Sequence, residues 1–435
     1  MEHIYTADEI KEIIIGNQHD IAFVLGNGLN RQACNQAISW FNLLKKIGGK
    51  SFEDYIEKGE EEKKTIDGIS YTEIFDALEN HSFKERMESA NWYDDVIEYI
   101  SRETPFIRPF RSGLFDDDID QSQSPLVRIK GKIKQLLDEH KSQKPCVFAE
   151  NERKDIRDIC YSLGIDESAF MRQREDNDKE LYNRLKQLYQ KLSSNYFSVV
   201  LANELKEKVC NEIEGWTLND EMSPMLQSIH EMNAPILTTN FDLSISKKMD
   251  ELYPNQMEYQ VMKSGKKSEV FPWSYYYGHR NLPIPSLGFG IWHMHGVASK
   301  PQSLCLGLSD YMRCAKEAWK MIHYDSFFES DGFMGKNTIG WKGYKTWLHI
   351  IFNKSLFITG LTLDENETFL RWLLIQRAKY FALFGSRSHK GWYVYPEEEE
   401  KEKKDFFGKK AFLEKAGIEL LPTESYEAIY KHLWI

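Results

Sequence analysis

The sequence lacks the features that mark disulfide-rich, zinc-binding and membrane-spanning proteins. Its 435 residues include six cysteines, and none of them belongs to a C-x-x-C pair. Such scattered cysteines exclude a disulfide framework and a zinc ribbon, and they are typical of a reducing compartment. No apolar run reaches about 18 residues, the length that a transmembrane helix needs. We therefore expect no zinc module and no association with a membrane.

Two further absences narrow the class of protein. The first residues contain no basic region followed by an apolar run, so we expect no signal peptide and a cytoplasmic protein. The formal net charge is −11, and no segment concentrates positive charge. Because nucleic-acid-binding proteins usually present a basic face, we expect nucleic acid to be an indirect partner at most.

Short apolar segments, several of them ending at glycine, indicate a parallel β-sheet. The first is the run IAFVL at 21–25, which is short, contains β-branched residues and stops at glycine. Helical patterns separate the later segments, notably over 367–380. This alternation predicts a Rossmann-like α/β fold with helices on both faces of the sheet. The other predicted strands lie near 235–239, 291–295, 355–359, 392–395 and 417–421.

The remaining segments are predicted from their helical periods and charges. Thr6 and Glu9 form a capping box ahead of a helix over 7–15. Residues 45–230 are mostly polar with helical periodicity, including amphipathic helices over 180–214. We predict one Rossmann-like domain from 1–44 and 231–435, and a large α-helical insertion over 45–230 that serves as a lid or an interaction surface. The acidic run at 397–400 reads as an exposed loop.

A glycine turn follows the first strand. Gly26 and Gly28 flank Asn27, and Asn30 lies in the same segment. Glycine permits a tight turn and close approach of a phosphate, and the following helix would point free amides at it. The dinucleotide fingerprint lacks its third glycine, so that a tight turn without a ligand is an equal alternative.

Polar residues also follow the later strands. Thr239, Asn240 and Asp242 come after the strand at 235–239, although asparagine and aspartate at such places also cap helices. Gly360, Thr362 and Asp364 follow the strand at 355–359, and they suit the other half of a dinucleotide or a plain turn capped by the aspartate. Ligands of open α/β sheets bind at these carboxyl ends of the strands.

Two histidines lie close to the strand at 291–295. His293 and His295 are two residues apart, so on one strand both would point into the same cleft. Histidine is the natural base near neutral pH. A hydrogen-bonded core histidine is one alternative. A metal ligand is another, although two histidines without a further ligand make a poor metal site.

The order of these motifs resembles that of the sirtuin superfamily, and most closely its bacterial sirtuin-like branch, many members of which serve in anti-phage defence. The most specific element is Thr239-Asn240-Phe241-Asp242 combined with His295-Gly296. The resemblance covers 21–44 and 231–435. The zinc module of sirtuin deacetylases is missing, and so is their Gly-Ile-Pro-Asp-Phe-Arg segment, which argues against protein deacylation.

The resemblance implies roles for individual residues. Asn240 matches the asparagine beside the nicotinamide ribose and would orient a water. His295 matches the catalytic histidine. Asp242 would hold the local geometry or the ribose. Gly26 and Gly28 match the phosphate-binding turn, whereas His293 has no firm counterpart.

The resemblance also implies an activity. We expect an NAD⁺ hydrolase that releases nicotinamide and ADP-ribose without a metal, and that acts in defence by depleting NAD⁺. Because constant activity would kill the cell, we expect gating through homo-oligomers or a second defence subunit. The alternatives are an NAD-dependent ADP-ribosyltransferase or deacylase, and a non-catalytic NAD-binding subunit. The trigger, the partner and the oligomer size stay open.

Overall fold

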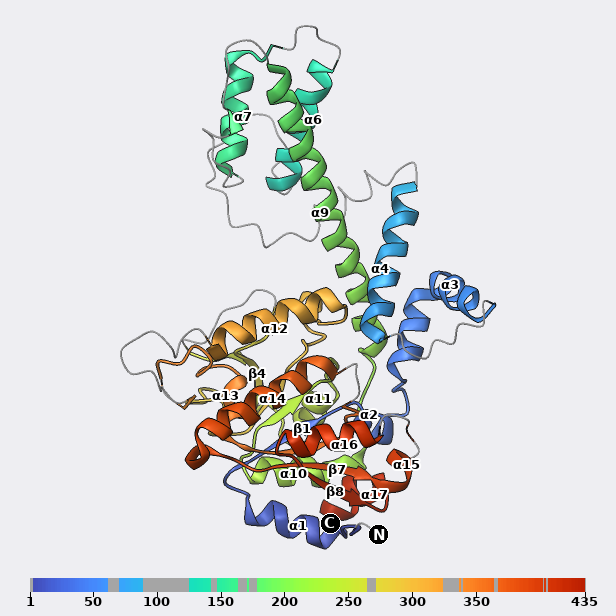
Figure 1. Ribbon diagram of the computed structural model, residues 1–435, viewed down its shortest axis with the longest axis vertical. Coiled ribbons are helices and arrows are strands. Elements are labelled where there is room, and N and C mark those ends of the chain that lie inside the picture. Colours follow the sequence, from blue (N-terminus) through green and yellow to red (C-terminus); the bar gives the residue numbers. More distant parts are fainter. Residues whose placement is uncertain are drawn as a thin grey trace. The chain divides into compact units, whose positions relative to one another are not determined.

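The computed structural model describes residues 3–61, 70–88, 125–141, 147–162, 170–171, 178–263, 271–323, 336–337, 339–363, 367–401, 403 and 406–434. The chain divides into two compact units, which Figure 1 shows as a ribbon. The sheet unit contains 1–78 and 205–435, and the helical unit contains 79–204. The sheet unit thus takes in 45–78 and 205–230, which the sequence analysis assigned to the insertion.

The described residues form one eight-stranded sheet with the order β3-β4-β5-β2-β1-β6-β7-β8. Its strands are β1 (Ile21–Leu25), β2 (Ile236–Thr238), β3 (Glu258–Val261), β4 (Tyr275–Gly278), β5 (Gly290–His293), β6 (Ser355–Thr359), β7 (Gly391–Pro396) and β8 (Glu419–Thr423). The six strands from β5 to β8 in this order pair in parallel, and all six were predicted. The pair β3 and β4 was not predicted and extends one edge in antiparallel pairing.

Helices connect the strands, as a Rossmann-like fold requires. In the sheet unit and at its borders they are α1 (Ala7–Gly16), α2 (Gly28–Ala33), α3 (Trp40–Glu61), α4 (Tyr71–Glu88), α9 (Asp178–Ile213), α10 (Ser223–Glu231), α11 (Ser244–Leu252), α12 (Leu308–His323), α13 (Leu348–Asn353), α14 (Thr368–Leu383), α15 (Glu397–Lys401), α16 (Phe406–Lys415) and α17 (Tyr426–Tyr430). Short 3-10 helices are η1 (Asp220–Met222), η2 (Pro301–Ser303), η4 (Gly385–Arg387) and η5 (His432–Trp434). The helical unit adds α6 (Pro125–His140) and α7 (Glu150–Ser162).

The two faces of the sheet each carry an apolar core. Alternate residues of β1 point to opposite faces, with Ala22 and Val24 in one core and Phe23 and Leu25 in the other. Helices α12, α13 and α14 cover the first face, and α1, α10 and α11 cover the second. All five residues of β1 are buried. A strand buried on both faces explains the unbroken apolar run in the sequence.

Of two local predictions, one near each end of the chain, the first is confirmed and the second is wrong. The capping box is confirmed, because Thr6 N donates to Glu9 Oε2 at 2.8 Å and Glu9 N donates to Thr6 Oγ1 at 3.3 Å. The exposed loop predicted at 397–400 is wrong. These residues form α15, and the Glu397 carboxylate is buried and pairs with Lys401. The burial of Glu397 cannot be inferred from a uniform acidic run.

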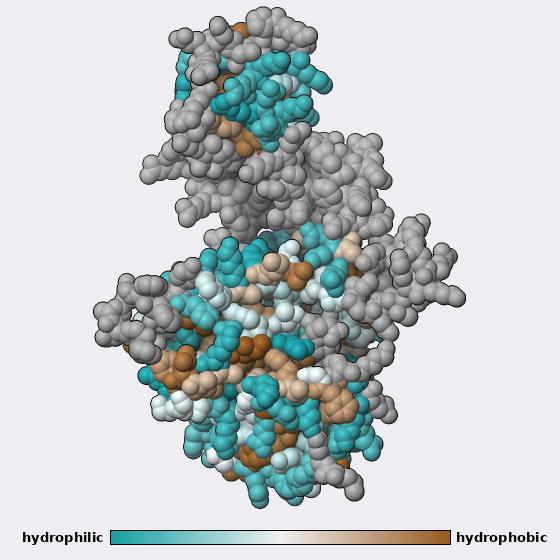
Figure 2. Space-filling model, in the orientation of Figure 1, coloured by the Kyte–Doolittle hydropathy of each residue, from teal (hydrophilic) through white to brown (hydrophobic). Residues whose placement is uncertain are grey.

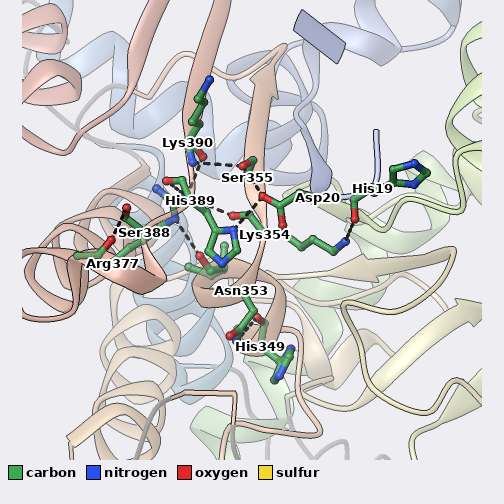
Figure 3. A network of polar contacts seen from close by, with 12 residues as sticks. His19, Asp20, His349, Asn353, Lys354, Ser355, Arg377, Ser388, His389 and Lys390 are labelled. Atoms are coloured by element: carbon green, nitrogen blue, oxygen red, sulfur yellow. Dashed lines mark hydrogen bonds and ion pairs between the residues drawn. The ribbon is translucent and has the colours of Figure 1, made fainter. Parts of the chain in front are cut away.

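A polar network lies where the parallel strands β6 and β7 begin (Figure 3). The buried guanidinium of Arg377, on α14, donates to the carbonyl oxygens of Ile351, Lys354, His389 and Lys390 at 2.8–3.2 Å. These carbonyls lie just before β6 and β7 or at the end of α13. One side chain therefore satisfies backbone groups of three segments where the parallel strands begin.

The helical unit has a small core of its own. Ile133 of α6, Ile156 of α7 and Leu185 of α9 are fully buried in it. Asp178, at the start of α9, accepts hydrogen bonds from Phe148 N at 2.6 Å and from Arg153 at 2.5 Å. Most of the described residues of this unit are helical, as the period of the sequence predicts.

The surface carries scattered apolar residues. Figure 2 shows them interspersed with hydrophilic ones on the face in view. Ile339, Leu383 and Phe407 are among the most exposed large apolar side chains, and they belong to separate segments. Single exposed apolar residues of this kind are ordinary on protein surfaces. Among the described helices, none combines the length and the apolar composition that crossing a bilayer requires.

Candidate active site

A cavity of the sheet unit lies at the carboxyl ends of the parallel strands. Its walls include residues that follow β1, β2, β5 and β6, which are neighbours in the sheet. The cavity is partly open to solvent, and the space that the centre of a water-sized sphere can occupy in it is about 190 Å³. The predicted site residues that line it are Asn27, Gly28, Thr239, Asn240, His295, Gly360 and Thr362.

The turn after β1 packs directly against the end of β6. A Cβ atom at Gly26 would lie 2.3 Å from the Gly360 carbonyl oxygen, and one at Gly28 would lie 2.6 Å from the Gly360 Cα. Gly360 itself has a φ of 70°, which glycine adopts without strain. The Gly-x-Gly motif is therefore required for the close packing of two turns beside the cavity, whatever ligand binds there.

The amino terminus of α2 differs from the open anion site that the sequence led us to expect. Gly28 N donates to the Gly360 carbonyl at 2.9 Å, and Leu29 N donates to the Gly26 carbonyl at 3.2 Å. The helix has only six residues. Arg31 and Lys403 instead bring positive charge to the cavity lining, and Arg31 has no ion-pair partner in the part of the chain that the structure describes.

Asn240 is held in one orientation at the cavity wall. Its backbone N donates to Thr238 Oγ1 at 3.1 Å, and its carbonyl oxygen accepts a hydrogen bond from His293 Nδ1 at 2.8 Å. Its side-chain Nδ2 donates to the Gly26 carbonyl at 3.2 Å. Because a carbonyl only accepts, this bond fixes which end of the amide is nitrogen. The Oδ1 atom therefore remains to accept a hydrogen bond from a ligand or a water.

His293 supports Asn240 and does not line the cavity. β5 ends at His293, so the strand alternation that would bring His295 to the same face does not continue. His293 Nδ1 bonds to Asn240, and Nε2 lies 3.4 Å from the Tyr259 hydroxyl. Burial lowers the pKa of His293. The expectation that both histidines point into one cleft is therefore wrong.

Asp242 and Asn30 also lie outside the lining of this cavity, and they bind each other. Asn30 Nδ2 donates to Asp242 Oδ2 at 2.6 Å. Ser244 completes the group: its backbone N donates to Asp242 Oδ1 and its hydroxyl donates to Asn30 Oδ1, both at 2.9 Å. All three residues are buried. This network ties α2 to the loop after β2, which fits the part of the prediction in which Asp242 holds the local geometry.

His295 presents one open ring nitrogen. The residue is 2% exposed, and its Nε2 is buried without a hydrogen-bond partner among the described residues. Nδ1 lies 3.3 Å from the Tyr311 hydroxyl. Burial lowers the pKa of His295 to about 4, so the ring is neutral at pH 7. In a neutral imidazole whose Nδ1 lies beside the Tyr311 hydroxyl, Nε2 is the second donor or acceptor.

The segment after β6 was predicted to supply three residues to the site, and the structure describes two of them. Gly360 and Thr362 line the cavity, and Thr362 is exposed. Asp364 lies outside the described residues. Within the described chain, no group of three or more His, Cys, Asp or Glu side chains is arranged to hold a metal ion.

Several lining residues were not predicted. Arg31 directly follows the glycine turn, and its charge beside that motif was a signal in the sequence. Tyr311 and Glu367 come from α12 and from the start of α14, and no local pattern places them near the cavity. Tyr71 and Phe75 of α4 also line it. They were missed because the first turns of α4 were assigned to the insertion.

The family models and the curated sequences contain no relative of this chain. No protein-family model matches the chain, and no curated protein matches its sequence. Any assignment of function therefore has to come from the residues and the geometry of the cavity.

Proposed function

We propose that this chain hydrolyses NAD⁺ to nicotinamide, ADP-ribose and a proton. The observation that carries the proposal is that Asn240 and His295, from the loops after β2 and β5, line one cavity with Gly28 and Gly360. In open α/β sheets, nucleotides bind in the crevice at the carboxyl ends of the strands. The motif resemblance to the sirtuin superfamily concerns these same residues.

The cavity has groups for each part of a dinucleotide. Arg31 supplies a guanidinium for the pyrophosphate, because arginine matches phosphate oxygens with two parallel donors. Trp40 and Tyr71 offer aromatic surface for a base. Asn240 and His295 lie at the other strand ends, and we assign them to the nicotinamide ribose.

Cleavage of the bond between nicotinamide and ribose develops positive charge at the ribose C1′. Nicotinamide leaves as a neutral molecule, so the enzyme needs little acid assistance. Its tasks are to fix the ribose and to place one water on the open face. In the proposal Asn240 Oδ1 accepts a hydrogen bond from that water and directs its lone pair at C1′. The C–N bond breaks and a C–O bond forms.

His295 is the proposed proton acceptor. Its buried ring is neutral and its Nε2 is open. It accepts a hydrogen bond from a ribose hydroxyl or from the water, and it takes the proton as the C–O bond forms. A charged imidazolium at this place would repel the positive charge that develops at C1′. Burial keeps the ring in the form that the reaction needs.

We propose further that this activity belongs to a gated defence effector, which rests on the resemblance and on the toxicity of constant NAD⁺ loss. In that role the chain acts as an oligomer or with a second subunit. Nucleic acid would then be a trigger and not a ligand of the cavity.

The products test the proposal. Purified chain incubated with NAD⁺ should release nicotinamide and ADP-ribose in equal amounts. Nicotinamide without free ADP-ribose would show transfer to another acceptor and contradict hydrolysis. NAD⁺ that binds with unchanged concentration over time, in the purified chain and in expressing cells, would contradict hydrolysis by the chain alone and leave a gated enzyme or a binding subunit.

A further inference from the structure

One short segment contacts His295 from two directions. Cys305 N donates to the His295 carbonyl oxygen at 2.7 Å, and the Tyr311 hydroxyl lies 3.3 Å from His295 Nδ1. Cys305, Leu306 and Tyr311 line the cavity. The segment 305–311 thus fixes both the backbone and the ring of the proposed catalytic histidine.

Two helices hold this segment, and each uses one ionisable side chain. Asp76 of α4 accepts a hydrogen bond from Leu308 N at 3.0 Å. Lys206 of α9 forms an ion pair with Asp310 at 2.7 Å, with 4% and 13% of the two side chains exposed. Asp310 also accepts a hydrogen bond from Leu306 N at 3.4 Å. Both helices therefore act on the backbone between Leu306 and Asp310.

The fit at this segment is close. A Cβ atom at Gly307 would lie 2.0 Å from Asp76 Oδ1, so glycine is what allows α4 to approach. An ion pair as buried as that of Lys206 and Asp310 adds little net stability compared with apolar residues of similar size, because both charges lose their hydration. What this ion pair does is hold the Lys206 and Asp310 side chains in one relative position.

α4 and α9 are also the helices by which the chain leaves and re-enters the sheet unit. α4 begins at Tyr71 and α9 ends at Ile213, and the residues between 79 and 204 form the helical unit. A change in the position of either helix would act on Asp76 or Lys206, and through them on the segment 305–311.

We propose that Asp76 and Lys206 are positioning residues through which the helical unit regulates His295. They set the segment 305–311, and Tyr311 then sets the hydrogen bonding of the His295 ring. The consequence for activity rests on the proposed NAD⁺ hydrolysis, whereas the coupling itself does not. Binding of a partner to 79–204 would change the His295 site by this route.

The test reads the ring of His295 directly. The full chain is labelled with ¹⁵N-histidine, and the His295 signals are identified by their loss in His295→Gln. The ¹⁵N shifts of the two ring nitrogens report which one carries the proton. Lys206→Met and Asp76→Asn should move these signals in the same direction as Tyr311→Phe. Lys208→Met, at an exposed position of the same helix, should leave them unchanged.

A double-variant comparison separates coupling from general loosening of the structure. If Lys206 acts through Tyr311, Lys206→Met has no further effect on the His295 signals in a Tyr311→Phe background. Lys206→Arg should restore the wild-type signals. Unchanged His295 signals in Lys206→Met, or shifts that simply add to those of Tyr311→Phe, would overturn the proposal. Should Lys206→Met fail to fold, Asp76→Asn supports the same comparison.

The two proposals fail in different ways. The ¹⁵N shifts need no turnover, so a chain that does not cleave NAD⁺ leaves the coupling measurable. If the chain is active, Lys206→Met should lower kcat/KM at least tenfold, and this loss should vanish in the Tyr311→Phe background. A Lys206→Met variant that keeps full NAD⁺ hydrolysis and shows unchanged ¹⁵N signals of His295 would overturn the coupling but not the proposed hydrolysis.

Discussion

At the scale of single residues, burial decides the chemistry of His295. Its ring is enclosed by Phe241, Phe369 and Tyr311, and the carboxylate of Glu367 also lines the cavity. Desolvation penalises the charged ring and lowers its pKa to about 4. The neutral form, which the proposed mechanism uses, therefore predominates from neutral pH down to about pH 5.

This shift predicts the pH dependence of the reaction. The kcat/KM for NAD⁺ should stay level between about pH 5 and pH 7, and it should fall as pH drops through the pKa of His295 near 4. Stopped assays after short exposure to each pH would measure it. An exposed histidine with an ordinary pKa would instead give a decline centred near pH 6.5. Such a profile would contradict the lowered pKa of His295.

The glycine turn gives a second prediction at this scale. Gly28→Ala places a methyl group 2.6 Å from the Gly360 backbone, which cannot move away as a flexible side chain would. We expect NAD⁺ binding to weaken at least tenfold and the melting temperature to fall. Gly408→Ala is the matched control, because an alanine there meets no atom within 4 Å and lies in a helix. The control should be neutral or stabilising by up to about 1 kcal/mol. Equal effects of the two substitutions would contradict the account.

At the scale of elements, the buried guanidinium of Arg377 links α14 to the first residues of β6 and β7. Burial lowers its pKa to about 9, which leaves it charged at pH 7. Arg377→Met would leave carbonyl oxygens of three segments without a donor. We expect a loss of about 3 kcal/mol or more in the free energy of unfolding. Urea unfolding followed by tryptophan fluorescence measures it.

The control for this substitution lies on the same helix. Lys379 is exposed on α14, so Lys379→Met should change the free energy of unfolding by no more than about 0.5 kcal/mol. A similar small effect for Arg377→Met would show that water replaces the guanidinium, and that the network of Figure 3 contributes little to the fold.

Elements that are buried on both faces were predictable from the sequence. The run at 21–25 predicts β1 because no polar face interrupts it. β3, with the sequence EYQV at 258–261, is an edge strand with exposed ends and a mixed pattern, so its sequence carries no such signal. α15 was missed for a similar reason, since its four glutamates look alike in the sequence although Glu397 is buried and Glu398 is exposed.

The residues of the candidate site also fall into those that were predictable from the sequence and those that were not. Asn240 and His295 were predictable because each follows a strand, and parallel strands bring their carboxyl ends to one edge. Tyr311 was not predictable, because it lies beside His295 only as a result of how the chain folds back after β5. The separate positions of His293 and His295 were also unpredictable, since they depend on where β5 stops hydrogen bonding.

At the scale of the whole molecule, buried neutral histidines should make stability depend on pH. Burial lowers the pKa of both His295 and His349 to about 4, below the unfolded value near 6.5. The unfolded chain therefore gains protons first as pH falls. Stability is constant above about pH 6.5 and declines toward pH 4, by about 2 kcal/mol per histidine at pH 5.

His349 allows this prediction to be tested away from the cavity. Both of its ring nitrogens are buried without partners among the described residues. His349→Leu should remove roughly half of the pH-dependent loss of stability attributed to the pair, measured as urea midpoints at pH 7.5 and pH 5. His19→Gln, at an exposed position, should keep the full loss. Equal pH dependence in the two variants would contradict the burial argument.

The central claim is that Asn240 and His295 act on bound NAD⁺ and do not merely bind it. The most direct measurement is the rate of nicotinamide release at saturating NAD⁺, with NAD⁺ binding measured in parallel, for the wild-type chain, Asn240→Ala and His295→Ala. Both variants should still bind NAD⁺, and each should lower kcat by about 10² or more. Variants that bind NAD⁺ and release nicotinamide at the wild-type rate would contradict it.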